Sequence, residues 1–239
     1  MINIIFRSQT ISFDNDNLNL QYFDSGDLHG NDNFRIPDKN PPVYEILNRI
    51  DPILLQSALA AAIDGQPVPL TAKISKDCTL DIITLDDITG KQIFHHSLAF
   101  LIAQTIFETY PTAALQNITV SNTNCVLQFA ADFAFTDCTI LKEQLLRHLQ
   151  TNIAIQRIDA FQKEMLVETY SSLLQPYAQT MLAQYDDYDF VPVAARQNFV
   201  LPVQEQDLFV TNTAILKDFS LDIQSIAQGF VLTAAYQKQ

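Results

Sequence analysis

Apolar and polar residues alternate over the first part of the chain. Ile2, Ile4 and Phe6 occupy alternate positions, and a similar alternation returns from Ile11 to Tyr22. A period of two is typical of a half-buried β-strand. The intervening run Asp14-Asn15-Asp16-Asn17 consists of turn-forming residues. The pattern therefore predicts a β-hairpin over residues 1–22 with its turn at residues 14–17.

The next stretch combines a polar loop with short elements. Residues 23–42 hold glycines and prolines among Asp and Asn, so we expect a mobile loop there. Residues 43–50 predict a short helix, and the β-rich run 80–85 predicts a strand. Residues 55–63 fit either an alanine-containing strand or a second helix, before a turn at Asp64-Gly65. Together they predict a small mixed α/β unit of about 88 residues.

The hydrophobic period changes to that of a helix at Ser97. The apolar face comprises Leu98, Leu101, Ile102, Thr105, Ile106 and Phe107. Ser97 is a typical N-cap residue, and Tyr110-Pro111 is a typical end. We expect a core helix over this segment.

The rest of the chain predicts alternating strands and helices. Strands are expected at residues 118–120, 126–135, 153–158, 208–210, 215–221 and 230–235, and helices at 136–149, 159–170 and 173–182. Asp159 is the expected cap of one helix, and Pro176 the expected interruption of the last.

Composition narrows the range of partners. The 239 residues include 14 Lys+Arg and 27 Asp+Glu, for a formal net charge of -13, and the basic residues are scattered singly. Binding to nucleic acid requires clustered Lys and Arg that neutralise phosphates, so direct nucleic-acid binding is not expected. The 48% of hydrophobic residues and 16 phenylalanines are enough for a core in one or two domains.

Cysteine spacing and the N-terminus indicate the compartment. Cys78, Cys125 and Cys138 are odd in number and form no CxxC pair, so we expect buried free thiols in a reducing environment. The chain has no signal-like start and no apolar run of about 18 residues. We therefore expect a cytoplasmic protein with no membrane partner.

The sequence shows no motif for a phosphate-binding loop or for a metal site. With five glycines, neither GxxxxGK[ST] nor GxGxxG can be written, so no phosphate-binding loop is expected. His95 and His96 are adjacent and cannot converge on one ion from a helix, so we expect no metal and no cofactor. We interpret the pair as a helix-entry residue and a surface residue.

Nucleophilic and acidic candidates are few. Ser97 follows His96, and Cys138 lies ten residues before His148, but neither has a recognisable nucleophile elbow. The acidic run Asp186, Asp187, Asp189 is interpreted as a solvated turn rather than a metal or acid/base cluster.

The order of features from Val43 to Pro111 resembles the N-terminal region of threonyl-tRNA synthetases, a TGS domain followed by an editing domain. The resemblance lies in Pro42-Val43-Tyr44-Glu45-Ile46-Leu47, Ala61-Ala62-Ile63-Asp64-Gly65-Gln66-Pro67-Val68, Leu80-Asp81-Ile82-Ile83-Thr84, Gly90 and His96-Ser97-Leu98-Ala99-Phe100-Leu101-Ile102-Ala103-Gln104. It implies the α+β class: a ubiquitin-like β-grasp TGS domain over residues 1–90 and a synthetase-editing-like α+β domain over residues 91–239.

The chain departs from this family at the editing site. There a His-x-x-x-His pair on the helix and a later Cys-x-x-x-His pair line the site that hydrolyses mischarged tRNA. Here His96 matches the first histidine, whereas Phe100 stands at the second. No Cys follows Cys138 and no His follows His148, so the later pair has no counterpart in the sequence. The resemblance therefore predicts a degenerate site without catalytic residues.

The chain resembles a second family where it departs from the synthetase pattern. Uridine-kinase-like nucleoside kinases carry the same TGS and synthetase-like module before a P-loop kinase domain. Their helix resembles Ser97–Ala103, with an apolar ring at the place of Phe100, and their module ends in a segment like residues 215–221 followed by 228–232. This chain stops at Gln239, before such a kinase domain would begin.

Three hypotheses follow. The favoured one is a non-catalytic module that senses a small ligand (a nucleoside, nucleotide or amino acid) or docks a partner protein. The others are a free-standing aminoacyl-tRNA editing hydrolase that uses His96, and a translation-associated interaction module. The predicted ligand-binding residues are His96, Phe100, Tyr188, Asp189 and, as a counter-charge, Arg196.

Overall fold

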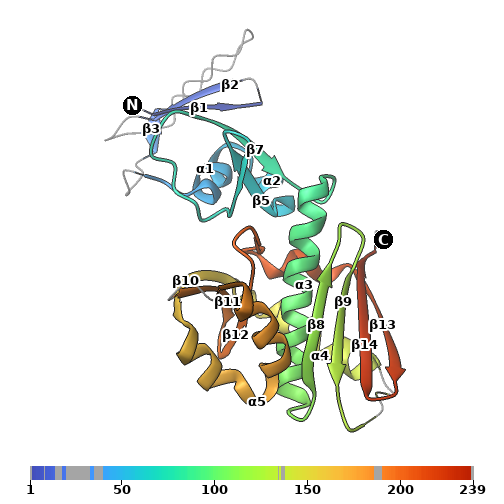
Figure 1. The fold of residues 1–239 in the computed structure, drawn as a ribbon. Helices are drawn as coiled ribbons and strands as arrows, with labels where there is room; N and C mark the ends of the chain where they lie inside the picture. The colour runs from blue at the N-terminus through green and yellow to red at the C-terminus, as the bar shows by residue number, and fades with distance from the viewer. Residues whose placement is uncertain are drawn as a thin grey trace. The chain divides into compact units, whose positions relative to one another are not determined.

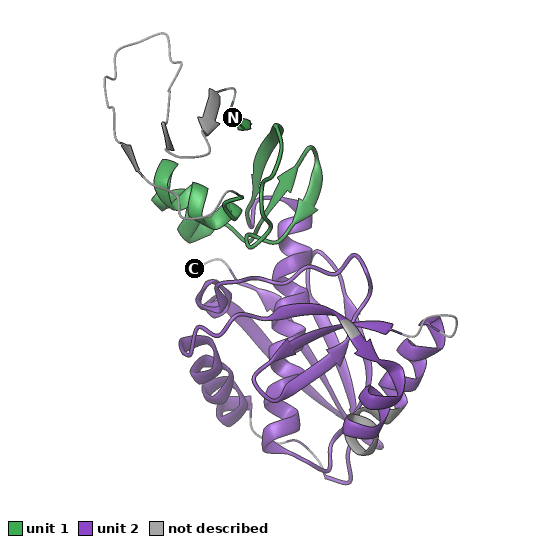
Figure 2. Cartoon of the chain, turned by 90° about the vertical axis from the view of Figure 1, so that its left-hand side faces the viewer, with its two compact units in different colours: residues 1–84 green, residues 85–239 purple. Residues whose placement is uncertain are grey.

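The computed structural model describes residues 2–7, 9–13, 18–19, 33–34, 40–133, 135, 138–185 and 190–237. It divides the chain into two compact units, residues 1–84 and 85–239 (Figure 2). Both units combine helices with β-sheet, so the predicted α+β class is confirmed. The boundary after residue 90, which the family resemblance implies, stays a prediction.

The first unit is built on a five-stranded sheet (Figure 1). Its elements are β1 (Ile2–Phe6), β2 (Gln9–Phe13), α1 (Val43–Ile50), α2 (Pro52–Ser57), β5 (Ala60–Ile63), β6 (Gln66–Val68) and β7 (Cys78–Ile83), and β3 (Leu18–Asn19) pairs separately with β4 (Asn33–Phe34). The strand order is β2-β1-β7-β5-β6, with β1 and β7 parallel at the centre. This order, with a helix crossing between β2 and β5, is that of a β-grasp fold.

The apolar face of α1 supplies the core of this unit. Val43, Ile46 and Leu47 are buried and pack in one cluster with Ile4 and Leu80 of the two central strands. Three side chains at i, i+3 and i+4 form the stripe by which a short helix covers a sheet.

Backbone pairing bears on two local predictions in the first unit. Strands β1 and β2 pair antiparallel, from Ile2 with Phe13 to Phe6 with Gln9, within the range predicted for a hairpin. The predicted loop at 23–42 and the turn at 14–17 lie largely outside the described residues. Residues 55–63 contain both alternatives, because α2 ends at Ser57 and β5 begins at Ala60. Asp51 caps α2 by accepting a bond from the Leu54 amide at 2.9 Å, and Pro52 occupies the first turn.

The second unit surrounds one long helix. Its elements are α3 (Ile88–Thr109), β8 (Ala114–Val120), β9 (Cys125–Ala130), α4 (Cys138–Gln150), β10 (Gln156–Gln162), α5 (Lys163–Leu182), η1 (Ala183–Tyr185), β11 (Phe190–Arg196), β12 (Phe199–Pro202), η2 (Thr213–Lys217), β13 (Phe219–Ile226) and β14 (Gly229–Tyr236). One sheet has the order β13-β14-β9-β8 and another the order β10-β11-β12. In Figure 1, α3 runs between the two sheets.

The central helix begins nine residues earlier than its predicted N-cap. It starts at Ile88, and Ser97 is an interior, fully buried residue rather than a cap. From Ile93 to Ile106 the side chains are buried around most of the helix, except at His96. A helix covered on all sides carries no polar face, so its hydrophobic pattern does not mark its first turn.

Other boundaries also differ from the predictions. Asp159 lies inside β10 and caps no helix, since α5 begins at Lys163. The two helices predicted at 159–170 and 173–182 are one helix, which continues through Pro176. Residues 208–210 form no strand, and the predicted strand 215–221 is divided between η2 and β13.

The cysteines of the described chain are free thiols. Cys78 and Cys125 are buried and Cys138 is half-buried. Burial raises the pKa of the Cys125 thiol to about 12, and raises the pKa of Cys78 with help from Asp64. These two thiols are therefore protonated at neutral pH and unsuited to nucleophilic attack. Among the described helices, none is long and apolar enough to cross a membrane.

Candidate functional site

His96 faces a loop that follows β12. Its Nε2 lies 3.6 Å from Oδ1 of Asp207. The loop is closed on itself, because the amide of Gln204 donates to Asp207 Oδ2 at 3.0 Å and the amide of Asp207 donates to the Gln204 carbonyl at 3.1 Å. Asp207 is thereby held in place before any ligand arrives.

The neighbouring Ser97 fastens the continuation of this loop to α3. Its buried Oγ accepts a bond from the amide of Val210 at 2.9 Å and donates to the Ile93 carbonyl at 2.7 Å. The hydroxyl proton is therefore given to the Ile93 carbonyl and not to His96, which leaves Ser97 unsuited to the role of a nucleophile activated by His96.

Phe100, one turn further along α3, is completely buried. Its ring meets Phe199 of β12 edge-on at 5.1 Å between centroids, and Phe209 of the loop at 6.0 Å. Phe209 also lies 6.4 Å from the imidazole of His96. An aromatic cluster thus fills the side of the helix on which the family resemblance places a second histidine.

Burial controls the charge of His96. It lowers the pKa of the imidazole, and the nearby charge of Asp207 opposes this effect without cancelling it. At neutral pH the side chain is therefore uncharged, and its contact with Asp207 is not an ion pair. A neutral imidazole beside a carboxylate can accept a proton, which is the one element of acid–base chemistry present here.

Arg196 lies in a different place from His96. Its guanidinium is buried and donates to the carbonyls of Ile153 and His148, to Thr151 Oγ1, and to Gln104 Oε1. Gln104 is eight residues from His96 on α3, a rise of about 12 Å. The arrangement brings His96 and Phe100 together but not Arg196, which joins α3, α4 and β11. Its assignment as a ligand counter-charge stays a prediction.

Tyr188 and Asp189 lie outside the described residues, as do Asp186 and Asp187. Their neighbours in sequence line a pocket of about 320 Å³ formed by Gln184, Tyr185, Phe190, Pro192, Gln204, Glu205 and Gln206. Phe190 directly follows the predicted residues Tyr188 and Asp189 in sequence, and sequence analysis did not single out the other lining residues. Glutamines in loops carry no motif, so no sequence signal could have identified them.

Two further histidines of the described chain, His95 and His148, have structural partners. His95 is buried, not a helix-entry residue, and its Nε2 accepts a bond from the Tyr236 amide at 3.2 Å. His148 Nε2 lies 3.3 Å from Glu108. Cys138 and His148 are ten residues apart on α4, about 15 Å along the axis, and so form no catalytic pair. The described part of the chain contains no group of three His, Cys, Asp or Glu residues that could hold a metal ion.

Comparison with known proteins gives partial similarities to one kind of enzyme. No family model matches the chain. A threonine–tRNA ligase of Clostridium acetobutylicum is 29% identical over 135 residues, which are 56% of this chain and 21% of the relative. One from Clostridium botulinum (strain Langeland) is 30% identical over 126 residues, 52% of this chain and 20% of the relative.

A third relative covers more of the chain. The threonine–tRNA ligase of Clostridium tetani is 24% identical over 165 residues, 68% of this chain and 26% of the relative. The matched part spans about a fifth to a quarter of each of these relatives. The chain therefore contains a region similar to part of a threonyl-tRNA synthetase.

Proposed function

We propose that this chain is a non-catalytic binding module, made of a TGS-like domain and an editing-like domain with a degenerate site. The observation that carries the proposal is the environment of Phe100. A buried phenylalanine packed on Phe199 and Phe209 occupies the position where the resemblance places a catalytic histidine. The scaffold is kept while the polar group at that position is lost.

The loop opposite His96 supports the same proposal. Val203 and Asp207 are four residues apart, the spacing of the family's later Cys-x-x-x-His pair, and Asp207 contacts His96. We infer that these two residues take the place of that pair. On this basis, three of the four site groups are replaced by Phe100, Val203 and Asp207, and a hydrolytic site reduced to one histidine and one aspartate lacks its thiol and two imidazoles.

The topology of the first unit supports the TGS assignment. The order β2-β1-β7-β5-β6 with parallel β1 and β7 is the arrangement expected for this ubiquitin-like domain. The nucleoside-kinase relationship rests on the apolar ring at Phe100 and the segments at residues 215–221 and 228–232. Our proposal is that the module, which resembles the N-terminal half of such kinases, senses a small ligand or docks a protein.

A deacylation assay tests this proposal. Mischarged tRNA specific for threonine is incubated with the chain, with its His96→Ala variant, and with an editing-competent threonine–tRNA ligase as positive control. We expect the chain and the variant to give the same background rate, because one neutral imidazole lacks its partner groups.

The alternative function is a free-standing aminoacyl-ester hydrolase. The observation that favours it is the neutral His96 held 3.6 Å from Asp207, an arrangement in which a carboxylate can orient a general base. This hypothesis predicts a deacylation rate well above background that falls about 100-fold or more in His96→Ala. Such a result would replace the non-catalytic proposal.

A further inference from the structure

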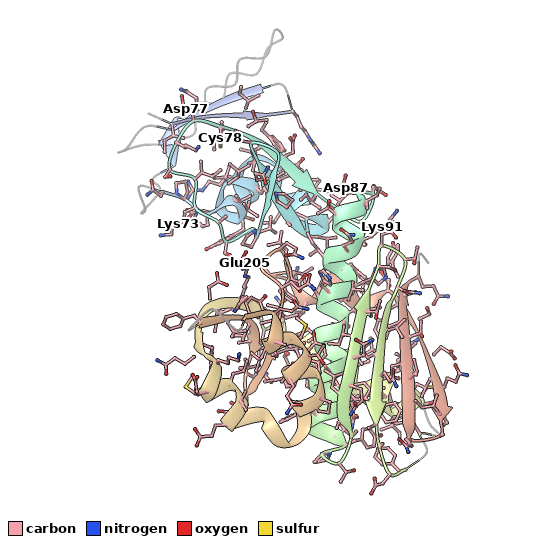
Figure 3. The ribbon with its side chains drawn as sticks, in the orientation of Figure 1. Lys73, Asp77, Cys78, Asp87, Lys91 and Glu205 are labelled. Carbon is pink, nitrogen blue, oxygen red and sulfur yellow. The ribbon has the colours of Figure 1, made fainter. Side chains whose placement is uncertain are left out.

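The pocket beside the degenerate site is lined by a distinctive set of groups. Two rings, Tyr185 and Phe190, form part of its wall together with Pro192. Three glutamine side chains supply amides, and Glu205 supplies a carboxylate, while none of the described residues that line the pocket is basic. Figure 3 labels Glu205 on the loop that follows β12. The pocket's volume of about 320 Å³ is enough for a small organic molecule.

The aromatic wall is partly open and partly fixed. Phe190 leaves 52% of its surface exposed, although it begins a strand whose following residues are buried. Tyr185 is held by a hydrogen bond from its hydroxyl to the Val203 carbonyl at 2.9 Å. A flat apolar body seated between these residues would remove the exposed ring from water and would find a wall already in position.

The electrostatics of the pocket disfavour anions. Burial and then the charge of Glu205 raise the pKa of Tyr185, and Asp207 adds to the effect. Arg157 acts in the opposite direction, but its Nε already contacts Asp159 at 2.9 Å. A phosphate or a free carboxylate would therefore meet repulsion, whereas an ammonium group would be attracted to Glu205 and to the faces of the rings.

We propose that this pocket binds a small organic cation with an aromatic body, its ring against Phe190 and Tyr185 and its ammonium group at Glu205. The proposal rests on the assignment of the chain as a binding module and deepens it by naming the ligand class. The earlier expectation was a nucleoside, a nucleotide or an amino acid. The present proposal narrows that range to a positively charged aromatic compound, because the pocket disfavours phosphate and other anionic groups.

A series of three indoles of similar shape tests the charge requirement. Calorimetric titration of the full chain uses tryptamine as the cation, tryptophol as the neutral analogue and indole-3-acetate as the anion. We expect saturable binding of tryptamine, about tenfold weaker binding of tryptophol, and no measurable binding of indole-3-acetate. Equal affinity for all three, or binding of none, overturns the proposal.

Two variants locate the site. Glu205→Gln and Phe190→Ala should each weaken tryptamine binding about tenfold, with an unchanged melting temperature because both side chains are exposed. Glu143→Gln, which removes an exposed carboxylate from α4, is the matched control and should bind tryptamine like the unaltered chain. Unchanged affinity in Glu205→Gln contradicts the proposal even if tryptamine binds.

The two proposals fail separately. Deacylation that depends on His96 would overturn the non-catalytic function without affecting tryptamine binding at Glu205. An inactive chain that binds no tryptamine would instead overturn the ligand class alone.

Discussion

Gly229 lies so close to the backbone of the neighbouring strand β9 that only glycine fits there. It begins β14 with a φ of +142°, and a Cβ built there would lie 1.9 Å from the carbonyl oxygen of Phe129. Gly65 also has a positive φ, +78°, but a Cβ there would meet no atom within 4 Å. Gly229 is therefore required both by its positive φ and by the lack of room for a Cβ, whereas Gly65 is required by its positive φ alone.

This difference predicts the effects of two alanine substitutions. Gly229→Ala should destabilise the second unit by about 3 kcal/mol, because the strand β9 must shift to relieve the clash. Gly65→Ala, the control, should cost the first unit about 1 kcal/mol. Amide hydrogen exchange in β9 and β7 measures the two losses separately. Equal losses would show that the contact with Phe129 is relieved at no cost.

Among the elements, the polar cluster around Arg196 joins α3, α4 and β11. The guanidinium satisfies two backbone carbonyls and Thr151 on one side and Gln104 on the other. Because Arg196 lies on β11 while its partners lie on α3 and at the end of α4 and just beyond it, the side chain holds these elements together. Its removal leaves carbonyl oxygens unsatisfied in a buried place.

We therefore expect Arg196→Met to destabilise the chain by about 3 kcal/mol, since it removes several charge-assisted hydrogen bonds while keeping most of the apolar stem. Arg147→Met, in an exposed arginine of α4, is the matched control and should change stability by less than about 0.5 kcal/mol. Urea unfolding gives both values. A small effect at Arg196 would mean that water replaces the lost donors.

On the scale of the whole molecule, three histidines of the described chain contribute to its response to mild acid. Burial is the main cause that lowers the pKa of His95, His96 and His148, so the folded chain binds fewer protons at these sites than the unfolded chain. Stability contributed in this way is complete above the unfolded pKa of about 6.5 and is lost as the pH falls through and below it. The carboxylates Asp207 and Glu108 oppose the shift without reversing it.

The melting temperature should accordingly fall between pH 7.5 and pH 5. His148→Gln should show a smaller fall, because one of the three groups no longer titrates. Asp77 is distinguishable from the histidines: hydrogen bonds from Asn3 lower the pKa of its carboxyl, so its contribution is lost only in more acidic solution. A melting temperature that is constant or rises toward pH 5 would contradict this assignment.

Sequence analysis identified the elements better than their ends. The helix at Val43–Ile50 matches its prediction because its apolar stripe faces one sheet and its other side faces water. The start of α3 was missed because that helix is covered on nearly all sides. Pro176 did not divide α5, since tertiary packing can outweigh the loss of one helical hydrogen bond.

The candidate site could be predicted in part. The family resemblance selected His96 and Phe100, and in the structure both lie beside Phe209. Asp207 and Phe209 were missed, because no motif marks them and their approach to α3 depends on a loop more than 100 residues away. The bond between Ser97 and Val210, which fixes that loop, spans 113 residues of sequence.

The sequence by itself determined that the chain combines helices with strands and that its cysteines form no disulfide framework, because these follow from local period and cysteine spacing. The place of Phe100 at a family histidine follows from the resemblance and belongs to the proposed function. Only the tertiary structure decided which groups face His96, that Arg196 is a clamp between elements, and that Glu205 lies with two aromatic rings around a pocket. Such groupings depend on long-range packing and on loops without regular periodicity, so residue identity alone does not specify them.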